Sequence, residues 1–160
     1  MKRTTGEMGD TYSQLYFHYV FAVQNRISLI QPGWKEDLYL YMIGIVENHD
    51  HRLYSINGTS NHLHLLVSMN AKQSPSDLMY NLKRGSSLWV NNEHLVPGKF
   101  SWQEGFGAFS YGKSQIPSII HYIRTQEQHH QKQTFQEEYL KFLELYEIEY
   151  DPRYILKEIQ

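Results

Sequence analysis

The stretch Asn61-His62-Leu63-His64-Leu65-Leu66-Val67 decides the fold of this chain, because it alternates as a half-buried β-strand does. Successive side chains of a strand point to opposite faces of a sheet. The odd-numbered aliphatic residues therefore share one face, which we expect to line the core. His62 and His64 share the other face, where two imidazoles two residues apart can bind one metal ion.

This His-x-His pair also occurs by chance, so two half-exposed surface histidines are the alternative interpretation. Position 66 is Leu66, which excludes a histidine-triad hydrolase, and no Asp-His pair follows, as a metallo-β-lactamase would require. The chain has nine histidines and no cysteine. Any metal must therefore use imidazole, carboxylate or amide ligands, and a disulfide framework is excluded.

Outward from this strand, the chain alternates between strand and helix patterns. Runs of aromatic and β-branched residues predict strands, and apolar residues at helical spacing predict helices. The expected strands cover residues 12–23, 52–57, 62–69 and 106–111, and the expected helices cover residues 34–48, 74–91, 115–131 and 135–146. This order predicts an α+β fold: a ferredoxin-like split βαβ antiparallel sheet with helices on one face, plus C-terminal helices, one of which carries Tyr122.

The helix expected at residues 74–91 has a characteristic beginning, Ser74-Pro75-Ser76-Asp77. Proline is favoured in a first helical turn, and hydroxyl or carboxylate side chains cap the free amides there. We expect this helix to bury Leu78, Leu82, Leu88 and Trp89.

The composition bounds the class of protein. A length of 160 residues suits one domain, and 41% hydrophobic with 20% charged residues is typical of a globular chain. We expect residues 1–11 to form a flexible tail and residues 12–160 a single domain. No apolar run is as long as a membrane span and no signal-peptide pattern opens the chain, so we expect a cytoplasmic protein with no membrane partner.

The charge is unevenly distributed. The formal net charge is -2, which is unusual for a protein that binds DNA. Residues 137–160 carry seven acidic and three basic residues, whereas residues 1–136 carry ten acidic and twelve basic residues. The body of the chain is therefore slightly basic, and any phosphate binding would have to come from local clusters.

A second group of candidate residues, His121-Tyr122-Ile123-Arg124-Thr125-Gln126, falls in the helix expected at residues 115–131. Tyr122 and Gln126 are four residues apart and share a helix face. Tyrosine suits phosphodiester chemistry, because phenoxide is a good leaving group and a phosphotyrosine can be attacked again by a DNA hydroxyl. A phenol is a weak nucleophile at neutral pH, so it needs activation or a polarised phosphate. A packing role is the alternative, since the chain has 13 tyrosines.

Basic side chains near these segments are candidates for binding DNA phosphates, although each also suits a solvated helix face. The candidates are Lys83, Arg84, Lys113 and Arg124. We interpret His129-His130, near the end of the expected helix, as surface residues compatible with the helix dipole.

Five segments, taken together in their order and spacing, are specific enough to indicate a family. They are His18-Tyr19-Val20-Phe21 with Asn25-Arg26, Asn61 to His64, Trp102 to Ser110, Tyr122 to His130, and Phe135 to Tyr139. Over about residues 12–154 the chain resembles the single-tyrosine HUH transposases of the 200/605 group of bacterial insertion sequences, the IS200-like transposases, and their repeat-associated relatives. The middle letter of HUH denotes a hydrophobic residue.

This resemblance implies a mechanism. His62 and His64 would bind a divalent metal ion, Mg2+ or Mn2+, and Gln126 matches the position of a third ligand in the family. Tyr122 would attack the scissile phosphate of single-stranded DNA and leave a 5′-phosphotyrosine and a free 3′-hydroxyl. Family members recognise hairpins at the element ends, and they act as homodimers in which the tyrosine helix of one subunit can complete the site of the other.

Asn61 departs from the family pattern, because many relatives have Asp there. We expect little effect, since the strand neighbour of His62 points to the opposite face. Three other functions remain open. They are a domesticated repeat-processing tyrosine nuclease, a non-catalytic nucleic-acid-binding ferredoxin-like module, and a metal-dependent phosphoesterase that uses water as its nucleophile.

Overall fold

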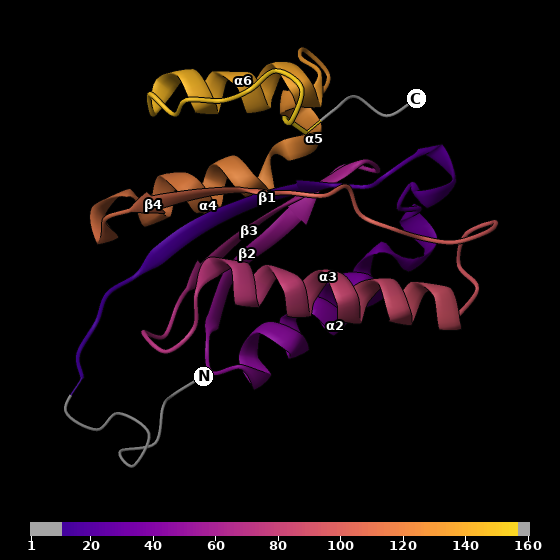
Figure 1. The fold of residues 1–160 in the computed structure, drawn as a ribbon, viewed down its shortest axis with the longest axis horizontal. Coiled ribbons are helices and arrows are strands. Elements are labelled where there is room, and N and C mark those ends of the chain that lie inside the picture. Colours follow the sequence, from indigo (N-terminus) through magenta and orange to yellow (C-terminus); the bar gives the residue numbers. More distant parts are fainter. Residues whose placement is uncertain (1–10, 157–160) are drawn as a thin grey trace.

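The computed structural model describes residues 11–156, and its centre is one antiparallel sheet of four strands in the order β2-β3-β1-β4 (Figure 1). The strands are β1 (Tyr16–Ala22), β2 (Arg52–Gly58), β3 (His62–Ser68) and β4 (Gly107–Tyr111). The two central strands pair along their full length, with Val20 opposite His64. This strand order and the helices between the strands confirm the predicted ferredoxin-like split βαβ arrangement.

Helices cover both faces of this sheet (Figure 1). The helices α2 (Pro32–Asn48) and α3 (Pro75–Asn92) cover one face, and α4 (Ile116–Arg124), α5 (Gln126–His129) and α6 (Phe135–Leu145) lie over the other. Two single 3-10 turns, η1 (Arg26–Ser28) and η2 (Lys113–Gln115), complete the elements in residues 11–156. No helix within that range is long and apolar enough to cross a membrane.

The two covered faces form two hydrophobic cores, because alternate side chains of each central strand enter different cores. Tyr19, Phe21, Leu63 and Leu65 pack on the side of α2 and α3. On the other side, even-numbered strand residues such as Leu66 pack with residues of α4 and α6. The face that carries His62 and His64 is therefore a core, not a half-exposed surface.

The sequence predicts one continuous helix at residues 115–131, and this prediction is wrong because the segment is divided into shorter pieces. The structure has a 3-10 turn, then α4, then a break at Thr125, and then the short helix α5. The Thr125 hydroxyl bonds the carbonyl oxygens of His121 at 3.0 Å and Tyr122 at 3.3 Å. Such bonds compete with the regular helical pattern, and threonine is a poor helix former. The first strand also begins at Tyr16, later than expected.

The helix α3 begins as predicted, with a capping box between Ser74 and Asp77. The expected burial of Leu88 is wrong, because its side chain is 48% exposed. Leu88 follows Leu78 by ten residues, which places it about 80° away around the helix. Trp89 is half-buried and stacks on Tyr41 of α2.

The structure describes the C-terminal end of the chain more fully than the N-terminal end. The expected tail at residues 1–11 falls almost wholly outside the described residues. After α6 the chain continues without regular structure to Leu156, whose side chain is 3% exposed and packs into the core beneath α4 and α6. This return of the chain helps to hold α6 on the sheet.

Candidate active site

His62 and His64 lie at the centre of the sheet and face the helices α4 to α6. Both side chains are fully buried, and their ring centroids are 5.1 Å apart. The strand alternation places them together, as the sequence predicts. Burial is the main cause that lowers the pKa of His62 to about 4, so this imidazole is neutral at physiological pH.

Asn61 contacts His62 directly, which corrects the expectation that it would point away. Its Oδ1 lies 2.7 Å from His62 Nδ1 and accepts a hydrogen bond from the Thr59 hydroxyl at 2.9 Å. Asn61 precedes β3 in the hairpin turn, so the alternation of the strand does not constrain its side chain. Since Asn61 Oδ1 is an acceptor, His62 carries its proton on Nδ1 and leaves a lone pair on Nε2.

His64 is held by a residue from the neighbouring strand. Its Nδ1 lies 2.7 Å from His18 Nε2. His18 is fully buried, and its other ring nitrogen has no hydrogen-bond partner in the described part of the chain. Burial lowers the pKa of His18 well below its usual value, so this ring is also neutral.

Glu138 of α6 extends into the centre of this histidine group, with only 2% of it exposed. Its Oε1 lies 3.0 Å from the Nε2 atoms of His64 and His130 and 3.5 Å from His62 Nε2. Burial alone would raise the pKa of Glu138, but hydrogen bonds from imidazole, that of His130 foremost, outweigh it and hold the pKa well below its usual range. The carboxylate is therefore ionised.

Tyr122 lies on α4 against the same group. Its hydroxyl donates a hydrogen bond to Glu138 Oε2, and its ring centroid is 5.9 Å from that of His64. Burial and the negative charge of Glu138 raise the pKa of Tyr122 above its usual value. The phenol is therefore protonated in this arrangement and needs help to become a nucleophile.

Gln126 joins the site although it begins a new helix. Its side chain is fully buried, and its Nε2 donates to Glu138 Oε2 at 3.2 Å. This orientation leaves Gln126 Oε1 3.2 Å from His62 Nε2. The fold thus brings together all four residues that the sequence predicted for catalysis and metal binding, His62, His64, Tyr122 and Gln126.

The four predicted DNA-binding residues are not brought to this cluster. Lys83 donates to the carbonyl oxygens of Gln103 at 2.9 Å and Gly105 at 2.5 Å, and burial lowers its pKa to about 8. Arg84, Lys113 and Arg124 are exposed at separate places.

Sequence reasoning missed four residues of the site, of which His18, described above, is one. His130 and Glu138 belong to the cluster, and the ring of His129 stacks on Tyr122 with centroids 4.5 Å apart. The prediction that His130 lies at the surface is wrong, because its side chain is 11% exposed and contacts Glu138 of α6, whereas His129 is half-buried. The sequence contained one signal for Glu138, because helical spacing places this acidic residue on the same face of its helix as the apolar Phe135 and Phe142.

The donor set fits a divalent metal ion. One ligand atom from each of His62, His64, His130 and Glu138 lies within 4.8 Å of the others. The neutral imidazole of His62 and the ionised carboxylate of Glu138 are ready to bind a cation without first losing protons. Imidazole nitrogen suits Mn2+ or Zn2+ better than Mg2+, which prefers oxygen.

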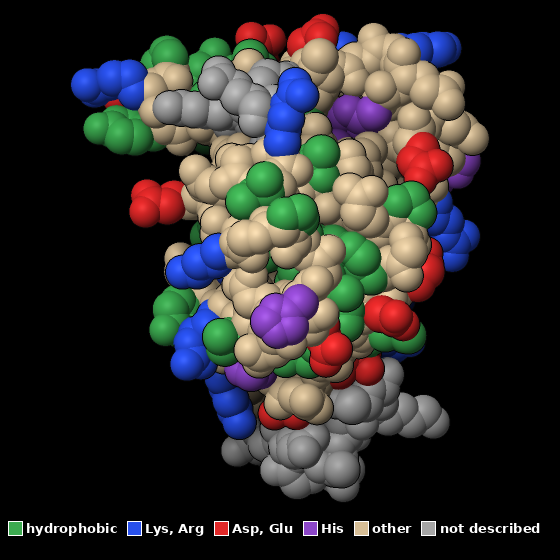
Figure 2. Space-filling model, turned by 90° about the vertical axis from the view of Figure 1, so that its right-hand side faces the viewer, with side chains coloured by type: hydrophobic (Ala, Val, Ile, Leu, Met, Phe, Trp, Pro, Cys, Tyr) green, Lys and Arg blue, Asp and Glu red, His purple; other side chains and the backbone are tan. Residues whose placement is uncertain are grey.

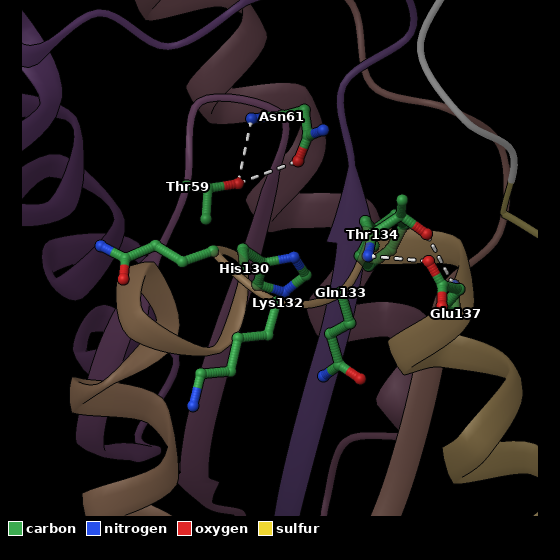
Figure 3. A pocket seen from close by; sticks show the side chains of 9 residues that line it. Thr59, Asn61, His130, Lys132, Gln133, Thr134 and Glu137 are labelled. Carbon is green, nitrogen blue, oxygen red and sulfur yellow. Dashed lines mark hydrogen bonds between the residues drawn. The ribbon is translucent and has the colours of Figure 1, made fainter.

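A pocket of about 400 Å³ opens beside His130 (Figure 3). Thr59 and Asn61 line it from the β2–β3 turn, and Thr134 and Glu137 line it from the start of α6. The pocket lies between the hairpin that carries the histidine pair and the loop that precedes α6. His130 is the residue of the cluster that lines it.

Comparisons with known proteins agree with this architecture. The family described as "Transposase IS200 like" matches residues 11–126. A solved structure assigned as a transposase, from Deinococcus radiodurans R1, is similar with a TM-score of 0.59 and 19% identity over 79% of this chain and 98% of that one. A REP-associated tyrosine transposase bound to a REP hairpin has a TM-score of 0.59 and 13% identity over 81% of this chain and 74% of that one. No curated protein matches.

Proposed function

Because the chain belongs to the family of IS200-like transposases, we propose that it cleaves and rejoins single-stranded DNA at insertion-sequence ends through a covalent 5′-phosphotyrosine. One observation carries the proposal. The hydroxyl of Tyr122 and the side chains of His62, His64 and Gln126 are gathered at one buried site, linked through Glu138. A tyrosine that only packed in the core would not need this polar surrounding.

In the proposed reaction, Tyr122 Oη forms a bond to the scissile phosphorus and the bond from phosphorus to the 3′-oxygen breaks. The phenolic proton passes to its hydrogen-bond acceptor, the Glu138 carboxylate, and the released 3′-oxygen takes a proton from water. A DNA hydroxyl later attacks the phosphotyrosine and restores a phosphodiester. The energy of the broken bond is kept in the adduct, so rejoining needs no nucleotide cofactor.

A divalent metal ion is the cofactor in this proposal, held by His62, His64 and Gln126. When bound, the ion polarises the scissile phosphate and stabilises the charge that develops on it. Mg2+ and Mn2+ are the candidate ions, and the imidazole ligands favour Mn2+. These three residues would supply two imidazole nitrogens and one amide oxygen to the ion.

Single-stranded DNA, with hairpins at the element ends, is the proposed partner, and a homodimer is the proposed assembly. The DNA hairpin in the related REP-associated structure supports a hairpin substrate here. Among the coloured side chains on the face in Figure 2, basic and acidic groups are mixed without a broad basic patch. Local contacts from Arg84, Lys113 and Arg124 would therefore hold phosphates, with a smaller share for Lys83, whose ammonium already has two acceptors.

The test incubates the full chain with labelled single-stranded DNA from the flanks of its gene and Mn2+, followed by a denaturing gel. We expect a protein–DNA adduct that requires the metal and is lost in Tyr122→Phe and in His64→Ala. Tyr80→Phe is the matched control, because Tyr80 is 67% exposed on α3, and it should form the adduct as the wild type does.

The outcomes separate the alternative functions. Metal-dependent cutting that survives Tyr122→Phe without an adduct would support a phosphoesterase that uses water. DNA binding without any cutting, repeated with hairpins from several sources, would support a non-catalytic binding module. Either result would contradict the proposal.

A second candidate is a domesticated nuclease that processes chromosomal repeats with the same chemistry. The similarity to a REP-associated tyrosine transposase favours it. The same gel separates the two functions when one substrate comes from the flanks of the gene and another is a repeat hairpin from elsewhere in the genome. Preferential adduct formation with the repeat would favour the domesticated nuclease.

A further inference from the structure

The cluster contains acceptor atoms that face one another. His62 has its proton on Nδ1, facing Asn61 Oδ1 at 2.7 Å, so His62 Nε2 presents a lone pair. That lone pair lies 3.2 Å from Gln126 Oε1 and 3.5 Å from Glu138 Oε1. Because neither oxygen can donate a proton, a cation bound between these atoms would make the contacts favourable.

The carboxylate has more neighbours than hydrogen bonds can satisfy. Glu138 Oε1 faces the Nε2 atoms of His62, His64 and His130 at 3.5, 3.0 and 3.0 Å. One carboxylate oxygen has two lone pairs, so it accepts two well-directed hydrogen bonds at most. His64 and His130 already account for two, so the third nitrogen, His62 Nε2, faces an oxygen that has no lone pair left for it.

The distances from Glu138 Oε1 to the three nitrogens are those between neighbouring ligands of one metal ion. Two ligands bonded to one ion at about 2.1 Å lie about 3.0 Å apart at a right angle and about 3.4 Å apart at a tetrahedral angle. The distances of 3.0, 3.0 and 3.5 Å from Glu138 Oε1 to the three nitrogens match this range. Small movements would admit an ion among them.

We infer that His130 and Glu138 bind the same metal ion as His62 and His64, so that docking of α6 completes the metal centre. Both residues lie beyond residue 126, where the match to the family ends. The inference rests on the proposed function, since it extends the proposed metal site with two ligands from the C-terminal segment. It makes α6 a part of the active site.

Two consequences follow from this ligand set. With His130 and Glu138 added to His62, His64 and Gln126, three of the five ligands are imidazole nitrogens, which favour Mn2+ or Zn2+ over Mg2+. The carboxylate also connects the ion to the nucleophile, because Glu138 Oε1 faces the metal site while Oε2 accepts the hydrogen bond from Tyr122. Glu138 would therefore hold the Tyr122 hydroxyl close to the metal-bound phosphate.

The experiment measures binding of Mn2+ alone, without DNA, to the full chain by titration calorimetry, with Mg2+ as a second probe. We expect Glu138→Gln and His130→Asn each to weaken Mn2+ binding by at least about tenfold, the lower end of what outer-shell changes cost. The thermal stabilisation of the protein by Mn2+ should shrink in parallel. Wild-type protein should bind Mn2+ more tightly than Mg2+.

Two exposed residues provide matched controls. Glu144→Gln changes a carboxylate on α6, and His121→Asn changes an imidazole on α4, both at exposed positions. Both variants should bind Mn2+ as the wild type does. Circular dichroism would establish that Glu138→Gln and His130→Asn fold.

His64→Ala distinguishes a wrong assignment of His130 and Glu138 from a wrong metal site. If His64→Ala loses Mn2+ binding while Glu138→Gln and His130→Asn bind as the wild type or more tightly, the inference is overturned and the proposed metal site survives. Tighter binding in Glu138→Gln would mean that the carboxylate excludes the ion. Unchanged binding in His64→Ala would contradict the metal site itself, and with it the inference.

Discussion

At the residue scale, the site depends on which nitrogen of each histidine carries the proton. An imidazole offers a lone pair on one nitrogen when the other donates a hydrogen bond. His62 donates from Nδ1 to Asn61, and His64 has His18 Nε2 at 2.7 Å from its Nδ1. If His64 Nε2 is to bind a metal, His18 must therefore accept the proton of His64 Nδ1.

We therefore predict that His18 positions His64. His18→Leu removes the acceptor for His64 Nδ1 and should weaken Mn2+ binding by about 10- to 100-fold, the usual effect of losing such a partner. His18→Gln keeps an acceptor in a similar volume and should restore part of the affinity. Titration calorimetry with Mn2+ measures both, and circular dichroism checks the fold. Wild-type affinity in a folded His18→Leu would contradict the prediction.

At the scale of elements, the β2–β3 hairpin sets the position of the histidine pair. Its turn is closed by a hydrogen bond from Thr59 N to His62 O at 3.1 Å. Gly58 lies so close to the returning strand that a Cβ there would contact the carbonyl oxygen of His62 and approach Leu63 Cα to 2.9 Å. The backbone cannot move away without shifting His62 and Leu63.

We predict that Gly58→Ala destabilises the protein by about 1–3 kcal/mol, the usual cost of forcing atoms into a packed region. Gly44→Ala is the matched control, because a Cβ there meets nothing within 4 Å and Gly44 lies inside α2. It should stabilise the protein by about 0.5–1 kcal/mol, since alanine is the better helix former. Urea unfolding measures both changes. Equal stability of Gly58→Ala and the wild type would contradict the predicted clash.

At the scale of the whole molecule, the C-terminal helices pack on the sheet of their own chain. Asn57 Nδ2 on β2 donates to the carbonyl oxygens of Ile123 at 3.0 Å and Arg124 at 3.2 Å, at the end of α4. Ile123 is fully buried in the core that α4 and α6 share with the sheet. Tyr122 therefore meets the histidines of its own chain.

We predict that catalysis uses the tyrosine and the histidines of the same chain. A mixture of Tyr122→Phe and His64→Ala should then form no more covalent DNA adduct than either variant alone, because each protomer lacks one required residue. The control mixes wild type with the double variant and should keep the wild-type adduct, which excludes interference between chains. Adduct formation in the first mixture, after co-expression to allow mixed dimers, would show exchange of the tyrosine helix.

Sequence by itself determined the fold class and which of the predicted site residues share a strand face or a helix face, because these depend on local periodicity. The alternation at residues 61–67 predicted which side chains share a sheet face, and the structure places His62 and His64 together on one side. Four-residue spacing placed Tyr122 and Gln126 on one side of a helical segment, and the proximity survives the break at Thr125. Short-range geometry of this kind follows from the backbone repeat alone.

Only the tertiary structure decided what covers the histidine face and what completes the site. Glu138 is 74 residues from His64 along the chain, yet its carboxylate lies 3.0 Å from the imidazole. No local pattern encodes that contact, since it depends on α6 packing over the second face of the sheet through residues such as Phe135 and Tyr139. The same packing buries His18 and His130 beside the site. Packing of apolar surface is non-directional. The apolar face of a helix therefore predicts that the helix is buried against something, but not which residues it contacts.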